Sequence, residues 1–103
     1  MLVQVNVFEG SSLENLDKAG EMFKILSDPT RLKILLNIAE DEKCVHEIAR
    51  AIDQELSNVS HHLKKMKDKN LVDYRKEGRH KYYRIDDDHV LTVMREGIEH
   101  ANE

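Results

Sequence analysis

The chain has 103 residues, 40% of them hydrophobic and 35% charged, with a formal net charge of −4 and one cysteine. This length suits one small domain with a thin core, so an oligomer is expected, and the lone cysteine excludes an intramolecular disulfide. No apolar run is long enough to span a bilayer, and residues 1–8 lack the features of a signal peptide, so we expect a cytoplasmic protein without a membrane partner.

The first predicted helix covers about residues 12–27, after an N-terminal arm of residues 1–11. A capping-box pattern begins it, and apolar residues follow at helical spacing, namely Leu13, Leu16, Ala19, Met22, Phe23 and Leu26. A second helix begins at Pro29 behind the N-cap Asp28, since proline is favoured at the first helical position. Its expected buried residues are Leu32, Ile34, Leu35 and Ile38.

A short third helix over about 45–52 and a fourth over about 57–69 are joined by a tight turn. We expect Ser57 to cap the fourth helix, which is polar and basic except for its buried side. The expected buried residues of the two helices are Val45, Ile48, Ala49, Ile52, Val59, Leu63 and Met66. A short helix, a tight turn and a polar second helix predict a helix-turn-helix.

Residues 71–76 and 80–85 read as two strands of a hairpin with a basic tip, which predicts the wing of a winged helix-turn-helix. A closing helix follows over about 87–102 and should pack on the first helix, within or between subunits. The predicted fold of residues 12–103 is therefore mostly α with a small β-hairpin: a winged helix-turn-helix DNA-binding and dimerisation domain, homodimeric through its first and last helices.

Charge is distributed unevenly along the chain. Residues 1–60 carry six Lys or Arg against eleven Asp or Glu, residues 61–84 nine against three, and residues 85–103 one against six. A basic central segment is the footprint of a face that meets phosphate, although a merely solvated helix and hairpin would have the same charge.

A helix that reads base edges needs short polar side chains near its N-terminal end, with cations beside them to contact phosphates. We therefore expect contacts with double-stranded DNA from Ser57, Asn58, Ser60, His61, Lys64 and Lys65 on the fourth helix, and from Arg75, Lys76, Arg79 and Lys81 on the hairpin. The alternative for Asn58 and His61 is a side chain that only faces solvent.

The closing helix carries a pattern of metal-ligand residues. His89 and His100 are eleven positions apart, so they share a face but lie about 16 Å apart along the axis. One ion with bonds of about 2 Å cannot reach both. An antiparallel partner helix would set Asp87 and His89 of one subunit beside His100 and Glu103 of the other, and these two imidazoles and two carboxylates suit zinc best.

A simpler interpretation remains for the same residues. Asp86, Asp87 and Asp88 are also what a helix N-terminus favours as a cap and as partners of its dipole, with the histidines on a solvated face. Four protein ligands would leave no position for a hydrolytic water, so an enzyme is not expected.

The whole pattern resembles the ArsR/SmtB family of metal-sensing winged-helix repressors, from about Leu16 to Glu103. The segments that carry the resemblance are residues 23–32, 44–49, 57–63 and 74–83. It implies a homodimer that binds a palindromic operator when metal-free and leaves it when metal binds. Zinc sensors of that family carry Asp-x-His and His-x-x-Glu on the last helix, and Asp87, His89, His100 and Glu103 match all four positions.

A second metal site of that family uses cysteines at the start of the third helix together with the N-terminal arm, and here the chain departs from the pattern. Only Cys44 matches, His46 replaces the second cysteine, and residues 1–20 contain neither Cys nor His. We therefore favour a partly buried helix cap over a weak site of Cys44, His46 and Glu47. The metal stays open among zinc, cobalt and nickel. The alternative function is a regulator of the same fold that senses redox state or another ligand without the C-terminal metal site.

Overall fold

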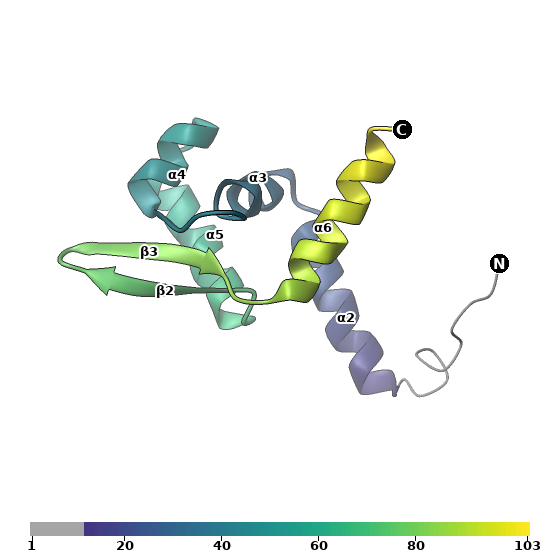
Figure 1. Cartoon of the computed structure of the whole chain (residues 1–103). Coiled ribbons are helices and arrows are strands. Elements are labelled where there is room, and N and C mark those ends of the chain that lie inside the picture. Colours follow the sequence, from purple (N-terminus) through teal and green to yellow (C-terminus); the bar gives the residue numbers. More distant parts are fainter. Residues whose placement is uncertain (1–11) are drawn as a thin grey trace.

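The computed structural model describes residues 12–103 (Figure 1). The predicted N-terminal arm, residues 1–11, lies outside the described residues. Along the chain the elements are α2 (Leu13–Leu26), α3 (Pro29–Asn37), β1 (Lys43–Cys44), α4 (Val45–Ile52), α5 (Leu56–Asp68), β2 (Val72–Glu77), β3 (His80–Ile85) and α6 (Asp88–Ala101). The predicted order of helices and the hairpin is confirmed.

The strands form a three-stranded antiparallel sheet in the order β1-β3-β2. The hairpin of β2 and β3 turns at Gly78, whose φ of 63° lies in the left-handed region that glycine adopts at low cost. β1 was not predicted from the sequence. It pairs Lys43 with Tyr83 and Cys44 with Tyr82, and two residues are too few for an alternating pattern to reveal a strand.

Three helices begin at the side-chain caps that the sequence indicates. Ser12 accepts a hydrogen bond from a backbone N–H of the first turn of α2, and Asp28 does so at the start of α3, directly before Pro29. Asp87 accepts the backbone N–H of His89 at the start of α6, over 2.8 Å. Each cap satisfies a donor that the helix itself leaves unpaired.

The prediction that Ser57 caps α5 is wrong. The N-cap position belongs to Glu55, whose backbone carbonyl accepts the N–H of Val59 over 3.1 Å, and the helix begins at Leu56. Ser57 therefore lies inside the first turn, with an exposed side chain.

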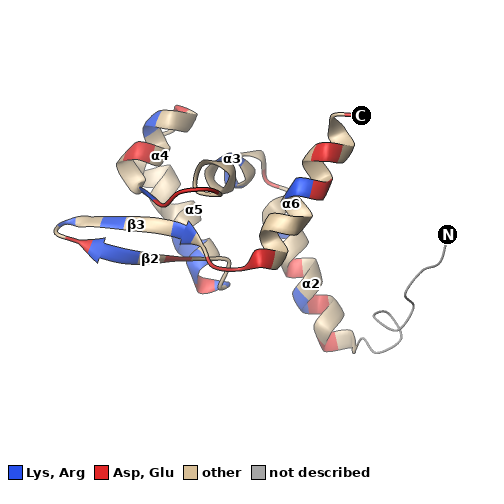
Figure 2. Ribbon diagram, in the orientation of Figure 1, with Lys and Arg blue, Asp and Glu red and all other residues tan. Residues whose placement is uncertain are grey.

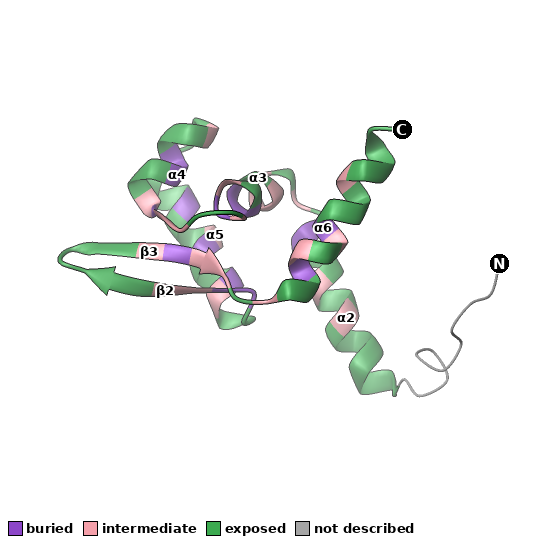
Figure 3. Ribbon diagram, viewed as in Figure 1, coloured by how far each residue is buried: buried purple, intermediate pink, exposed green. Residues whose placement is uncertain are grey.

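The core lies where α3, α4 and α5 meet the base of the hairpin and the start of α6 (Figure 3). Its fully buried side chains are Ile34, Leu35, Ile48, Val59, Leu63, Met66, Val72 and Val90. Leu32, Val45 and Ile52, which were expected to be buried, are half-buried and pack against this core.

α2 departs from the expected burial. Only Ile25 and Leu26 are buried, whereas the side chains of Leu13, Leu16 and Phe23 are 81%, 56% and 53% exposed. The reason is visible in Figure 1, where α2 extends away from α3, α4 and α5, so most of its apolar face has no cover within one protomer. No helix of residues 12–103 combines the length and apolarity needed to cross a membrane.

Candidate DNA-binding surface and metal ligands

α4 and α5 form the helix-turn-helix. Asp53 ends α4 in the left-handed conformation, with φ of 55°, and the chain turns directly into α5. α5 buries one side in the core and exposes the other, which carries all six of its predicted DNA contacts: Ser57, Asn58, Ser60, His61, Lys64 and Lys65. The amide of Asn58 also donates a hydrogen bond to the Gln54 side chain over 3.0 Å. The turn and α5 thus present short polar groups ahead of two lysines.

One polar contact fastens α5 to α3. Nε of Arg31 donates to Nδ1 of His62 over 3.1 Å, and Nε also lies 3.6 Å from a carboxylate oxygen of Asp28. Partial burial lowers the pKa of His62, because it penalises the charged imidazolium. A neutral His62 is what the contact requires, since Nδ1 must accept from Arg31.

The hairpin carries the four other predicted DNA contacts, and these differ in whether they form ion pairs within the protein. Arg75 pairs with the carboxylates of Glu42 and Glu77, and these hydrogen bonds raise its pKa. Among the residues that the structure describes, no ion pair involves Lys76, Arg79 or Lys81, although Nζ of Lys81 lies 4.6 Å from the centre of the Tyr74 ring. Figure 2 shows Lys and Arg residues along the hairpin, and Lys64 of α5 and Lys81 of β3 line one pocket.

α6 holds the four predicted metal ligands at its two ends. Asp87 caps the helix, and its Oδ1 lies 3.1 Å from Nδ1 of His89, whose side chain is 93% exposed. His100 lies in the last turn, and Glu103 follows the helix, both with exposed side chains. One protomer therefore brings Asp87 and His89 together and leaves His100 and Glu103 at the opposite end.

An apolar groove of about 410 Å³ lies between α2 and α6. Its lining residues are Phe23, Leu26, Ser27, Leu32, Val93, Met94, Gly97, Ile98 and Ala101. Phe23, one of the exposed apolar residues of α2, lines the groove, so an apolar surface on this side of the protomer has no cover within one chain.

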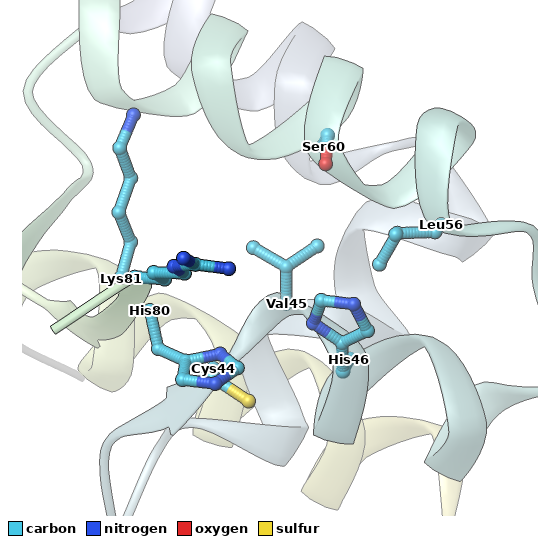
Figure 4. Close-up of a pocket in the computed structure, with 8 residues that line it drawn as sticks. Cys44, Val45, His46, Leu56, Ser60, His80 and Lys81 are labelled. Atoms are coloured by element: carbon cyan, nitrogen blue, oxygen red, sulfur yellow. The ribbon is translucent and has the colours of Figure 1, made fainter.

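The structure also brings together a second group of possible metal ligands, which was not predicted from the sequence. One ligand atom each from Cys44, His46 and His80 lie within 4.8 Å of one another, in a cavity of about 190 Å³ between α4, α5 and β3 (Figure 4). Glu47, considered with Cys44 and His46 from the sequence, instead accepts the backbone N–H of Cys44 over 3.0 Å as part of a helix cap. Only the pairing of β1 with β3 brings His80 to this place.

The chain is similar to known bacterial regulatory proteins. Residues 28–74 match the family described as bacterial regulatory protein, arsR family. The chain is 38% identical over 95 residues to a transcriptional repressor SmtB homolog of Synechocystis, covering 92% of this chain and 72% of the relative. It is 41% identical over 96 residues to the cadmium resistance transcriptional regulatory protein CadC of Listeria innocua, covering 90% and 81%.

A solved structure resembles the whole fold. The homodimeric winged helix-turn-helix DNA-binding domain from Mycobacterium bovis, a possible ArsR-family transcriptional regulator, matches with a TM-score of 0.79 and 33% identity over 91% of this chain and 90% of that one. The prediction of a winged helix-turn-helix is confirmed.

Proposed function

Because this chain belongs to the arsR family of bacterial regulatory proteins, we propose that it is a metal-responsive transcriptional repressor whose regulatory metal is zinc. The similarity to an SmtB repressor homolog and to a cadmium-resistance regulator supports a response to metal. The zinc assignment rests on the donor set of α6, and cobalt or nickel are its competitors.

The repressor is a homodimer in which the α2 and α6 helices of two copies cover each other. The unfilled groove between these helices and the 53% exposed Phe23 support this pairing, since such an apolar surface gains free energy when it is removed from water. The resemblance to a homodimeric domain supports it further.

The DNA partner is a palindromic operator, because a two-fold dimer presents two α5 helices to two half-sites about one helical turn apart. Ser57, Asn58, Ser60 and His61 contact base edges and nearby backbone, since they stand exposed on the first half of α5. The phosphate contacts come from exposed cations on α5 and the hairpin, namely Lys64, Lys65, Lys76, Arg79 and Lys81. Arg75, expected beside them, is held by two carboxylates and contributes less.

The regulatory site consists of Asp87 and His89 of one protomer with His100 and Glu103 of the other. The single observation that carries this proposal is the pairing of Asp87 Oδ1 with His89 Nδ1 at 3.1 Å. Two ligand atoms on a tetrahedral zinc ion with bonds of about 2.0 Å are about 3.3 Å apart, so this pair already has the required spacing. When bound, zinc would link two imidazoles and two carboxylates across the two protomers.

Zinc binding at this site also depends on pH. The pairing of Asp87 and His89 as ligands requires a deprotonated carboxylate and a neutral imidazole, so zinc affinity falls as the pH is lowered. Repression and metal binding are coupled in both directions, because operator DNA must weaken zinc affinity by the same factor by which zinc weakens operator affinity.

The test is fluorescence anisotropy of the full chain on a labelled palindrome selected from random DNA, with and without one zinc ion per protomer. We expect zinc to lower the DNA affinity of the wild type, and His89→Ala to keep DNA binding and lose the zinc effect. Thr92→Ala, one turn further along the exposed side of α6, is the matched control and should respond like the wild type.

Two results would contradict the proposal. DNA affinity unchanged by zinc in the wild type would remove the sensor function, whereas a zinc response retained in His89→Ala would remove the α6 site. Absence of salt-dependent binding to any duplex would remove the repressor function itself.

A further inference from the structure

We propose that the cleft between α5 and the hairpin binds a small organic anion that carries an aromatic ring. The cleft has a volume of about 530 Å³, which lies within the range of small-molecule sites, roughly 300–1,000 Å³. The binding itself needs no DNA. Its effect on repression rests on the function proposed above, because Ser60, Lys64 and Lys81 line the cleft and are also proposed DNA contacts.

Two elements build the cleft. α5 supplies three residues that recur at helical spacing on one of its sides, namely Ser60, Lys64 and Lys67. On the sheet, Tyr74 is the cross-strand partner of Tyr83, and Lys81 stands two residues before Tyr83 on β3. Residues two apart on a strand share a face, so all three side chains lie on the face of the hairpin that lines the cleft.

The cleft has a surplus of positive charge. Lys64, Lys67 and Lys81 line it, against the single carboxylate of Asp68. Within residues 12–103, Lys64 and Lys81 form no ion pair, whereas Nζ of Lys67 lies 3.6 Å from a carboxylate oxygen of Asp73. Two ammonium groups are therefore available to an anion, and the third is held beside them.

Tyr83 adds a buried donor. Its side chain is only 5% exposed, yet its hydroxyl forms no hydrogen bond with any residue of 12–103. No fully buried polar side-chain atom in this range lacks a partner, so the hydroxyl must be accessible, and Tyr83 lines the cleft. Burial raises the pKa of Tyr83, and the neighbouring Tyr74 adds to this. The hydroxyl therefore keeps its proton at neutral pH and can donate it in a hydrogen bond to an anion.

The apolar part of the cleft suits a ring. The rings of Tyr74 and Tyr83 lie with centroids 5.2 Å apart and planes inclined by 48°, and Val45 adds an aliphatic side chain. Aromatic groups favour tilted or offset contacts of this kind. An inorganic ion would leave most of the volume empty, whereas a ring with one anionic group would use both the apolar surface and the lysines.

The test is isothermal titration calorimetry of the metal-free full chain with phenyl phosphate, which joins a ring to a dianion. We expect one phenyl phosphate to bind per protomer, and inorganic phosphate to bind several-fold more weakly. Lys67→Gln and Tyr83→Phe should each weaken the binding of phenyl phosphate at least about tenfold, because each removes a donor to a charged group. Tyr83→Phe removes only a hydroxyl that is not bonded within residues 12–103, so it should fold normally.

Lys69→Gln is the matched control. It also removes a lysine that is ion-paired near the end of α5, to Glu21 over 3.0 Å, but Lys69 does not line the cleft. Its affinity for phenyl phosphate should equal that of the wild type.

The same compound should release the wild type from labelled operator and release Lys67→Gln only at higher concentration. Lys67 is not among the proposed DNA contacts, so Lys67→Gln should keep its operator affinity and its dependence on salt. Absence of phenyl phosphate binding, or equal affinity in wild type and Lys67→Gln, would overturn the proposal. A smaller salt dependence of DNA affinity in Lys67→Gln would assign the cleft to a backbone phosphate of DNA and overturn it as well. Failure of the repressor function would appear separately, as absent operator binding, since the titration contains no DNA.

Discussion

Arg31 donates a hydrogen bond from Nε to Nδ1 of His62 over 3.1 Å and thereby joins the first turn of α3 to α5. Burial lowers the pKa of His62 below its ordinary 6.5. The charged and titratable groups that act on this imidazole are Asp28, Arg31, His61 and Lys65, and of these only Asp28 raises its pKa. The contact is therefore a neutral one, and protonation of His62 works against the folded state.

The first prediction concerns stability against pH. The pKa of His62 is lower in the folded protein than in the unfolded chain, so the unfolded chain is protonated first as the pH falls. The contribution of His62 to the free energy of unfolding is therefore fully present above pH 6.5 and is lost as the pH drops below it. The lowered pKa values of Glu47, Asp73 and Glu77 act in the same direction, but only below about pH 4.5. Urea unfolding should therefore show a loss of stability from about pH 7 to about pH 5.5 that is smaller in His62→Gln.

At neutral pH, His62→Gln should also cost about 1 kcal/mol through the lost hydrogen bond. His100→Gln, which removes an exposed histidine that is not among the groups acting on His62, is the control and should keep the wild-type dependence. An equal pH slope in wild type and His62→Gln would contradict the assignment.

The second prediction separates two roles of Asp87. As the N-cap of α6 it accepts the backbone N–H of His89, which asparagine also does, whereas metal binding needs its charge. Asp87→Ala should cost about 1 kcal/mol of unfolding free energy, and Asp87→Asn much less. Both should weaken zinc binding, as measured by competition with a chromophoric chelator. Asp88→Asn is the control, because it removes one negative charge next to Asp87. If Asp88→Asn weakened zinc binding as much as Asp87→Asn does, this would argue against Asp87 as a ligand.

The third prediction concerns the groove between α2 and α6. Phe23 lines it and is 53% exposed in one protomer, so Phe23→Ala should weaken the dimer. The dimer loses two Phe23 side chains, one from each protomer, at about 1.5 kcal/mol each. This loss corresponds to a roughly 100-fold larger dissociation constant of the dimer. Sedimentation equilibrium measures this, with Leu36→Ala as the control, because Leu36 is similarly exposed on α3 and does not line the groove. Equal dimerisation of the two variants would place the interface elsewhere.

The fourth prediction compares two arginines of the hairpin. Arg79 forms no ion pair among residues 12–103, whereas Arg75 is held by Glu42 and Glu77. A plot of the logarithm of DNA affinity against the logarithm of salt concentration has a slope that loses about 0.9 for each lost phosphate contact. Arg79→Gln removes one such contact per protomer and should therefore reduce this slope by about 2 per dimer. Arg75→Gln should reduce it by less than half as much. Binding isotherms at several salt concentrations measure both slopes, and a larger effect at Arg75 would show that DNA displaces its carboxylate partners.

The sequence by itself determined the order of helices, the helix-turn-helix and the hairpin. These features depend on neighbours within a few positions: Ser12, Asp28 and Asp87 each satisfy a backbone donor in their own helix, and Gly78 permits its own turn. The exposed face of α5 follows from helical spacing alone. The N-cap of α5 was placed two residues too late, because Ser57 is a common cap residue although it lies in the first turn here.

Only the tertiary structure decided which distant groups meet. The pairing of β1 with β3 brings His80 to Cys44, and the approach of Glu42 to the hairpin occupies Arg75. The uncovered face of α2 likewise depends on where the other helices lie, because helical spacing marks an apolar side but not what covers it. Contacts between residues far apart in the chain follow from the packing of whole elements, and the local pattern of residues does not specify that packing.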